Sequence, residues 1–377
     1  MNAAAPRPIR AALIEPWLSG SHRAFAEGLA GSLGLPCDVV ALPGSSWRRR
    51  MRLSAIPLAE ALDALSPAPD VLLATDYVDL PALAALSAAA SRAPAVLYFH
   101  EDQLTYPRRD GARGDLDLGA ANVVSCLAAA RCAFPSHSQR EGFLAAIVER
   151  FGAGDGFDPT AIAAAIEEKS RVVPCGVDLA PFDLARARRA PRAGRPLRIA
   201  WPHRFDHDKN PDDFFAALAA LAADGLAFEI AALGRPSMEL PACMAEAREA
   251  LGGRVVAWGH LEGAAYAEAL AACDVVVSTA YQETFGLAVI ESIRAGCAPL
   301  LPRRLSYPEL LGAGADGRLF DDRGDLVRRL RSLVREPVAA RASAGELWRE
   351  MGRFSWDVVG PRFKELLEEA ASARANA

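Results

Sequence analysis

Short apolar runs rich in β-branched residues alternate with longer alanine- and leucine-rich stretches through most of the chain. Each short run has the length of a buried strand and each longer stretch the length of a helix, so the alternation predicts parallel strands joined by crossover helices. The rhythm restarts once, which indicates two doubly wound α/β domains. The predicted strands lie at 11–16, 71–75, 95–100, 132–137 and 171–176, and then at 197–202, 228–234, 255–260, 274–280 and 298–302.

A proline- and arginine-rich segment separates the two halves. Residues 183–196 read DLARARRAPRAGRP and have no hydrophobic period, which is typical of a linker. A chain of 377 residues with 51% hydrophobic residues suits two cores. We therefore predict an N-terminal Rossmann-like domain, a linker, a C-terminal Rossmann-like domain and a final helix that packs back on the first domain, at 1–180, 181–196, 197–355 and 356–377.

Two common nucleotide-binding motifs are missing. The loop after the first strand carries Gly20 but not G-x-G-x-x-G, and G-x-x-x-x-G-K-[ST] does not occur, so NAD, FAD and P-loop chemistry are disfavoured. The net charge of -5 argues against a wholly basic nucleic-acid binder. No apolar run is long enough for a secretory leader or a membrane span, and we expect a cytoplasmic protein without a membrane partner.

Cations follow a predicted strand in the second half. Arg204 and Lys209 lie on the short loop HRFDHDKNP after the strand at 197–202. In the first half, the loop SGSH offers the backbone amides of Gly20 and Ser21 together with His22. Cations and amides suit a phosphate group. Ligands of doubly wound domains bind at the carboxyl ends of the strands, here most naturally in the cleft between the two domains.

Two carboxylates flank a helix start in the same half. Glu283 precedes the predicted helix GLAVIESIRAG, and Glu291 lies inside it, on the order of 8 to 12 Å away. Carboxylates accept paired hydrogen bonds from sugar hydroxyls, and the free amides of a helix N-terminus favour an anion. We interpret the stretch as a clamp for a nucleotide sugar. The predicted helix N-terminus is Thr284, Phe285, Gly286 and Leu287.

These motifs resemble a known family. The runs HRFDHDKNP, VVPCGVDLAPF and GHLEGAAYAEALAACDVVVSTAYQETFGLAVIESIRAGCAPLLP are similar to the retaining GT-B glycosyltransferases of family four, with their E-x7-E element. The resemblance implies a GT-B fold, in which two Rossmann-like domains face each other across a cleft. It also implies that Arg204 and Lys209 contact the donor diphosphate, Glu283 the transferred sugar and Glu291 the ribose.

The first half narrows the resemblance. The runs LIEPWLSGSHRAFAEGL, VLYFHEDQLTYPRR and NVVSCLAAARCAFPSHSQREGFL resemble the enzymes that mannosylate queuosine in tRNA. The similarity implies GDP-mannose as the donor and the cyclopentenediol hydroxyl of queuosine in the anticodon of tRNA-Asp as the acceptor. Asp102 stands where that group usually carries asparagine.

The resemblance also implies the chemistry. His100 ends its predicted strand and is similar to the family's histidine that contacts the donor sugar near the reacting centre. A retaining transfer would proceed by front-face attack, with the leaving diphosphate stabilised by Arg204 and Lys209 and able to take the acceptor proton. We therefore expect His100, Arg204, Lys209 and Glu283 to be catalytic.

We expect an acceptor surface in the first half. The densest basic run is WRRRMR at 47–52, and YPRR at 106–109 is a further candidate for tRNA phosphates. Trp47 offers a face for base stacking. The predicted acceptor-binding residues are Trp47, Arg48, Arg49, Arg50, Glu101, Gln103, Tyr106 and Asn122.

No metal or other cofactor is expected. The DLD tripeptide at 115–117 does not follow a predicted strand and reads as a solvated loop, while Arg204 and Lys209 already neutralise a diphosphate. Two alternatives stay open. One is a family-four glycosyltransferase that acts on a lipid or polysaccharide, and the other is a non-catalytic GT-B protein that binds RNA or a nucleotide.

Overall fold

The chain forms two compact units. The structure is a computed structural model that describes residues 8–107, 115–152, 154, 156–236 and 240–375. The first unit comprises Met1–Gly176 with Trp356–Ala377, and the second comprises Val177–Ser355. Arg108 and Arg109 of the YPRR run lie outside the described residues.

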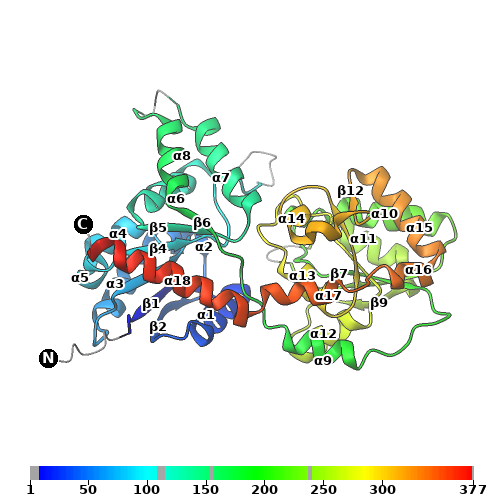
Figure 1. Ribbon diagram of the computed structural model, residues 1–377. Coiled ribbons are helices and arrows are strands. Elements are labelled where there is room, and N and C mark those ends of the chain that lie inside the picture. The colour runs from blue at the N-terminus through cyan, green and yellow to red at the C-terminus, as the bar shows by residue number, and fades with distance from the viewer. Residues whose placement is uncertain (1–7, 108–114, 153, 155, 237–239, 376–377) are drawn as a thin grey trace. The chain divides into compact units, whose positions relative to one another are not determined.

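The first unit contains one six-stranded sheet in the order β2-β1-β3-β4-β5-β6, with parallel pairing throughout. Helices join its strands, because parallel neighbours need a crossover. The strands are β1 (Ala11–Leu18), β2 (Cys37–Pro43), β3 (Val71–Thr75), β4 (Ala95–Tyr98), β5 (Arg131–Phe134) and β6 (Ser170–Val172). The helices are α1 (Gly20–Ser32), α2 (Trp47–Leu53), α3 (Ala55–Asp63), α4 (Leu80–Leu86), α5 (Ala88–Arg92), α6 (Leu116–Ala128), α7 (His137–Arg150), α8 (Pro159–Glu168) and α18 (Trp356–Ala375) (Figure 1).

The second unit repeats this plan with a sheet in the order β12-β11-β10-β7-β8-β9. The prediction of two doubly wound α/β domains is confirmed. The strands are β7 (Leu197–Trp201), β8 (Phe228–Ala232), β9 (Val255–Trp258), β10 (Val275–Val277), β11 (Ala298–Pro302) and β12 (Leu319–Phe320). The helices are α9 (Ala180–Ala187), α10 (Pro211–Ala223), α11 (Ala242–Leu251), α12 (Gly263–Ala271), α13 (Leu287–Arg294), α14 (Tyr307–Leu311), α15 (Arg323–Arg335), α16 (Pro337–Ala342) and α17 (Leu347–Glu350), with short 3-10 turns at η2 (His207–Lys209), η3 (Gly252–Arg254), η4 (Gly312–Ala315) and η5 (Met351–Phe354).

Two of the four edge strands, β2 and β12, were not predicted from the sequence. Strand β2 forms one edge of its sheet and is mostly half-buried, so it lacks the continuous apolar run of a central strand. Strand β12 has only two residues. The central strands β3, β4 and β10 are buried at every position, so each has a continuous apolar run that is easily recognised in the sequence.

The last helix belongs to the first unit. In α18, the Phe363 ring is buried and lies 5.1 Å from Tyr98 and 5.7 Å from Phe25. Trp356, at the start of the helix, packs against Gly28 and Gly176. A side-chain carbon built on either glycine would come within about 2.2 Å of the indole, so only glycine fits there.

The segment predicted as a linker is a folded part of the second unit. Helix α9 occupies its first residues, and the arginines that follow contact the interior. Arg189 and Arg192 both bind Asp274, whose side chain is fully buried. Two of the arginines in this segment are therefore held by ion pairs with a buried carboxylate, while Arg188 and Arg195 are exposed.

Within the described part of the chain, no helix is both long and apolar enough to cross a membrane.

Candidate active site

The order of the strands brings the predicted donor-binding loops together. In the second unit, β7 lies between β8 and β10, so the chain reverses its direction of strand addition at this point. The loop after β7 carries Arg204 and Lys209, and the loop after β10 carries Glu283. Since neighbouring parallel strands end at the same sheet edge, both loops lie at the switch point where doubly wound domains bind ligands.

Lys209 connects these two loops. Its residue surface is only 9% exposed. The Nζ donates a hydrogen bond to the carbonyl of Gln282 at 2.7 Å and lies 3.4 Å from Glu283 Oε2 and from Asp208 Oδ2. Two predicted donor-binding residues, Lys209 and Glu283, are therefore in contact.

Arg204 shares a carboxylate with Lys209. Its guanidinium donates to Asp208 Oδ2 at 3.2 Å while the side chain stays half exposed. Burial would raise the pKa of Asp208, but the charges of Lys209 and Arg204 outweigh it and lower that pKa below its ordinary value. Asp208, which contacts both cations, was not among the predicted site residues, although it stands between them in HRFDHDKNP.

The predicted helix begins four residues after Glu283 in the chain. Glu283 Oε1 accepts a hydrogen bond from the amide of Gly286 at 3.1 Å, and α13 begins at Leu287. Gly286 has a φ of 101°, and a side-chain carbon there would lie 2.9 Å from Leu310. Thr284 is half-buried, and the buried Phe285 packs edge-on against Phe354.

Glu291 lies inside α13, where Tyr266 of α12 contacts it. The Tyr266 hydroxyl donates to Glu291 Oε2 at 3.2 Å. Burial raises the pKa of Glu291 to about 7, and the hydrogen bond from Tyr266 opposes this only in part. The carboxylate therefore titrates near neutral pH, unlike an ordinary surface glutamate.

A second cluster lies at the strand ends of the first unit. Glu15 of β1 is completely buried, and His22 Nδ1 lies 3.2 Å from both of its carboxylate oxygens. His100 Nε2 lies 3.7 Å from Glu15 Oε2. Burial alone would raise the pKa of Glu15, but His100 and His22 hold it well below its usual range. Burial and the nearby His22 lower the pKa of His100 to about 4, so His100 is neutral at pH 7.

A hydrogen-bonded chain continues from this cluster. The amide of His100 donates to Asp76 Oδ1 at 2.8 Å, and burial raises the pKa of Asp76 well above its ordinary value. The Tyr77 hydroxyl donates to Glu101 Oε1 at 2.5 Å, and Gln103 Nε2 lies 3.3 Å from the same oxygen. Glu101 is thus oriented by two neighbours.

Other predicted acceptor residues serve the backbone. Asn122 is buried, accepts from the Gln103 amide at 3.2 Å and donates to the Asp76 carbonyl at 2.9 Å. Tyr106 is half-buried. Gly20, at a φ of 52°, and Ser21 are exposed at the start of α1.

The basic run at 47–52 forms most of α2 and is partly engaged by the protein itself. Arg48 binds Asp115 at 2.7 Å and lies over the Trp47 ring, while Arg50 donates to the Pro43 carbonyl at 2.9 Å. Arg49 is exposed. Asp115 of the DLD tripeptide caps α6, where its side chain accepts from the Leu118 amide.

Glu15, Asp76 and Tyr77 were not among the predicted site residues. A usable signal was present for both acids, because each is a charged residue at the end of an otherwise apolar strand, in AALIEP and VLLATD. A charge in such a place is costly unless it is paired, so it marks a polar cluster.

Comparison with known families matches both halves. Residues 10–177 match the family described as tRNA-queuosine alpha-mannosyltransferase N-terminal. Residues 186–351 match the glycosyl transferases group 1. The two matches together span most of the chain.

Individual relatives include two mannosyltransferases that are named for different acceptors. The chain is 29% identical to the tRNA-queuosine alpha-mannosyltransferase of Drosophila melanogaster over 95% of this chain and 96% of that protein. It is 30% identical to a GDP-mannose-dependent alpha-(1-6)-phosphatidylinositol dimannoside mannosyltransferase of Mycobacterium tuberculosis over 49% of this chain and 48% of that protein.

Solved structures share the fold. Sucrose-phosphate synthase of Thermosynechococcus elongatus superposes with a TM-score of 0.72 at 16% identity, over 97% of this chain and 100% of that one. HepE of Anabaena in complex with UDP gives a TM-score of 0.67 at 16% identity, over 96% and 100%. The predicted GT-B fold class is confirmed.

The raised pKa of Glu291 predicts a stability that depends on pH. The folded state binds this proton more tightly than the unfolded chain, so stability falls as pH rises from about 4.5 to about 7 and stays lower above that. Glu291→Gln keeps the acceptor for Tyr266 without the charge. We expect it to exceed the wild type in unfolding free energy at pH 8, by on the order of 1 to 3 kcal/mol, and to match it below pH 4.5.

Urea unfolding at pH 4, 6 and 8 measures this difference. Glu249→Gln, at an exposed position of α11, is the matched control and should show no such trend. A Glu291→Gln variant that is less stable than the wild type at pH 8 would contradict the assignment.

Proposed function

We propose, because this chain belongs to the tRNA-queuosine alpha-mannosyltransferase family of GT-B glycosyltransferases, that it transfers mannose from GDP-mannose to a cyclopentenediol hydroxyl of queuosine in the anticodon of tRNA-Asp. The observation that carries the proposal is the similarity to the Drosophila enzyme along 95% of the chain. The match of residues 10–177 to the N-terminal family supports the same acceptor.

The donor binds at the switch point of the second unit in this proposal. Arg204 is half exposed and Lys209 is aligned by Asp208, so both present cations that suit a diphosphate. The amides at the start of α13 add partial positive charge. Glu283, held by Lys209 and Gly286, accepts from hydroxyls of the mannose, and Glu291 accepts from the ribose.

We propose a retaining reaction by front-face attack. The bond between the anomeric carbon and the diphosphate oxygen breaks, and the queuosine hydroxyl oxygen bonds to the same face of that carbon. The hydroxyl proton passes to the departing diphosphate. His100, neutral at pH 7, hydrogen-bonds the sugar, and Glu15 and His22 fix its ring.

The acceptor is assigned to the first unit. Glu101 is the best oriented candidate to contact the queuosine hydroxyls, since Tyr77 and Gln103 both bind it. Gln103 and Asn122 support the loop in this proposal, while Tyr106 and the α2 residues Trp47, Arg48, Arg49 and Arg50 face RNA. Gly20, Ser21 and His22, at the start of α1, stay predicted donor-binding residues.

A second acceptor class rests on one observation. The mycobacterial relative, which is named for a phosphatidylinositol dimannoside substrate, matches about half of this chain. A lipid or polysaccharide acceptor is therefore the alternative for the same donor site. A non-catalytic protein would bind a nucleotide or RNA without turnover.

Nucleoside mass spectrometry tests the proposed reaction. The purified protein is incubated with queuosine-containing tRNA-Asp and, separately, with GDP-mannose, UDP-glucose and UDP-galactose. We expect a hexose on queuosine with GDP-mannose alone. Slow donor hydrolysis without tRNA modification would favour the lipid or glycan acceptor, and the absence of both would favour a binding protein.

Lys209→Ala tests the diphosphate site. Loss of a well-placed cation at the leaving group should lower turnover about 100- to 1,000-fold, because electrostatic stabilisation of this kind contributes about 2.7 to 4 kcal/mol. Lys209 also neutralises the buried Asp208, so its loss could destabilise the folded state. Arg204→Ala, at a half-exposed position, is a second variant that should disturb folding less. Lys364→Ala in α18 is the surface control. Near-normal turnover of both site variants would remove the diphosphate role.

We propose that turnover needs no metal. Glu15, His22 and His100 could in principle hold an ion, because their ligand atoms lie within 4.8 Å of one another. Glu15 already has partners within the protein, because His22 Nδ1 lies 3.2 Å from both of its oxygens and Trp17 donates its amide to the same carboxylate at 2.9 Å. We expect full turnover after dialysis against EDTA. A loss that zinc or manganese restores would instead assign this cluster a metal ion.

A further inference from the structure

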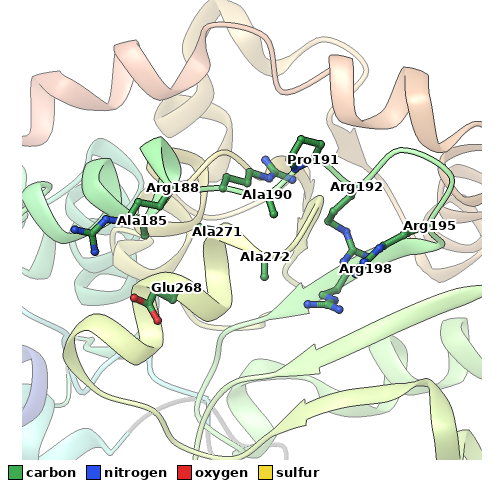
Figure 2. Close-up of a pocket in the computed structure, with 11 residues that line it drawn as sticks. Ala185, Arg188, Ala190, Pro191, Arg192, Arg195, Arg198, Glu268, Ala271 and Ala272 are labelled. Atoms are coloured by element: carbon green, nitrogen blue, oxygen red, sulfur yellow. The ribbon is translucent and has the colours of Figure 1, made fainter.

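A cavity of about 410 Å³ lies within the second unit, and neither Arg204, Lys209, Glu283 nor Glu291 lines it. Its walls come from the end of α9, the segment that leads to β7, and α12 (Figure 2). Arginine dominates the lining. The residues are Ala185, Arg188, Arg189, Ala190, Pro191, Arg192, Arg195, Arg198, Glu268, Ala271 and Ala272.

The cavity is at the edge of the sheet opposite to the donor loops. Arg198 is the second residue of β7, and its partner Glu229 is the second residue of β8. Arg204 and Lys209, in contrast, follow the carboxyl end of β7. The cavity is therefore a separate site from the proposed donor site.

Three of its arginines are fixed by buried or half-buried carboxylates. Arg189 donates to Asp274 at 3.0 Å and to two backbone carbonyls at 2.7 Å. Arg192 binds Asp274 at 3.2 Å and Glu229 at 2.8 Å, and Arg198 shares Glu229 at 2.9 Å. These contacts hold the guanidinium groups in place without a ligand.

Positive charge nevertheless exceeds negative charge here. With Arg341, which also binds Asp274, the cavity and its supports contain six guanidinium groups, and Asp274, Glu229 and Glu268 are the three carboxylates. Arg188 and Arg195 are exposed, and no hydrogen bond or ion pair of their side chains is found within the described residues. They lie at opposite ends of the row of arginines in Figure 2.

We propose that this cavity binds backbone phosphates of the tRNA outside the anticodon, an inference that rests on the proposed function. Arginine forks match phosphate oxygens, and two cations separated along a row suit successive phosphates of one strand. The lining contains no aromatic side chain on which a base could stack, which disfavours a free nucleotide. Contacts of this kind position an RNA without reading its sequence.

The basic helix α2, which the proposed function also assigns to RNA, has two of its arginines engaged within the protein. Arg48 and Arg50 are engaged by Asp115 and the Pro43 carbonyl, and binding RNA would have to displace these partners. Arg188 and Arg195 have no such competing contact within the described residues. The acidic Glu268 at the cavity opposes an anion, so the two exposed arginines must carry much of the attraction.

The test compares two double variants that remove equal charge. Arg188→Ala/Arg195→Ala changes the cavity, and Arg248→Ala/Arg335→Ala removes two exposed arginines elsewhere in the second unit. Filter binding of an unmodified tRNA-Asp transcript between 50 and 200 mM salt gives the slope of log affinity against log salt. Two lost phosphate contacts should reduce that slope by about 1.4 to 1.8. The control pair should leave it unchanged.

Two outcomes overturn the inference. The first is an equal slope for both double variants and the wild type. The second combines an unchanged tRNA slope with a difference in phosphate binding. If calorimetry shows that inorganic phosphate binds the wild type and not the cavity variant, the cavity is a site for small anions.

Turnover separates this inference from the proposed function. GDP-mannose hydrolysis should be unchanged in the cavity variant, with a raised tRNA Michaelis constant in the mannosylation assay. If the wild type mannosylates queuosine but the cavity variant keeps the wild-type slope, only the cavity inference fails. If the wild type modifies no tRNA with any donor, the proposed function fails, whatever the slope.

Discussion

Parallel pairing of every strand in both sheets is the constraint on which the candidate site depends. It sends the carboxyl ends of neighbouring strands to one edge, and the reversal of strand order beside β7 opens a place there for a ligand. Lys209 after β7 and Glu283 after β10 meet at this edge although 74 residues separate them. In the first unit, the same constraint brings Glu15, which lies within β1, close to His100, which follows β4.

Buried charge at these edges persists because it is paired. Asp208 is almost fully buried between Arg204 and Lys209, and Glu15 lies between two imidazoles. Removing one partner would leave an uncompensated charge, which is far more destabilising than the pair itself is stabilising. The ion pairs thus hold both cations in place beside Asp208.

A third buried carboxylate organises the other edge of the second unit. Asp274, which is fully buried before β10, binds Arg189, Arg192 and Arg341. It fastens the segment after α9 to the sheet and creates the arginine-lined cavity as a consequence. One acid therefore explains both why a composition typical of a linker folds and why positive charge gathers there.

The sequence by itself determined the two α/β domains, the central strands and the loops that carry Arg204, Lys209 and Glu283, because buried parallel strands have continuous apolar runs and their flanking polar residues stand out. The tertiary structure alone decided which charges meet. Lys209 beside Glu283, Glu15 beside His100, and Asp274 beneath the arginines depend on contacts between distant segments. A charged residue has the same appearance in a sequence whether it is solvated or paired, since only packing sets its dielectric surroundings and its partner.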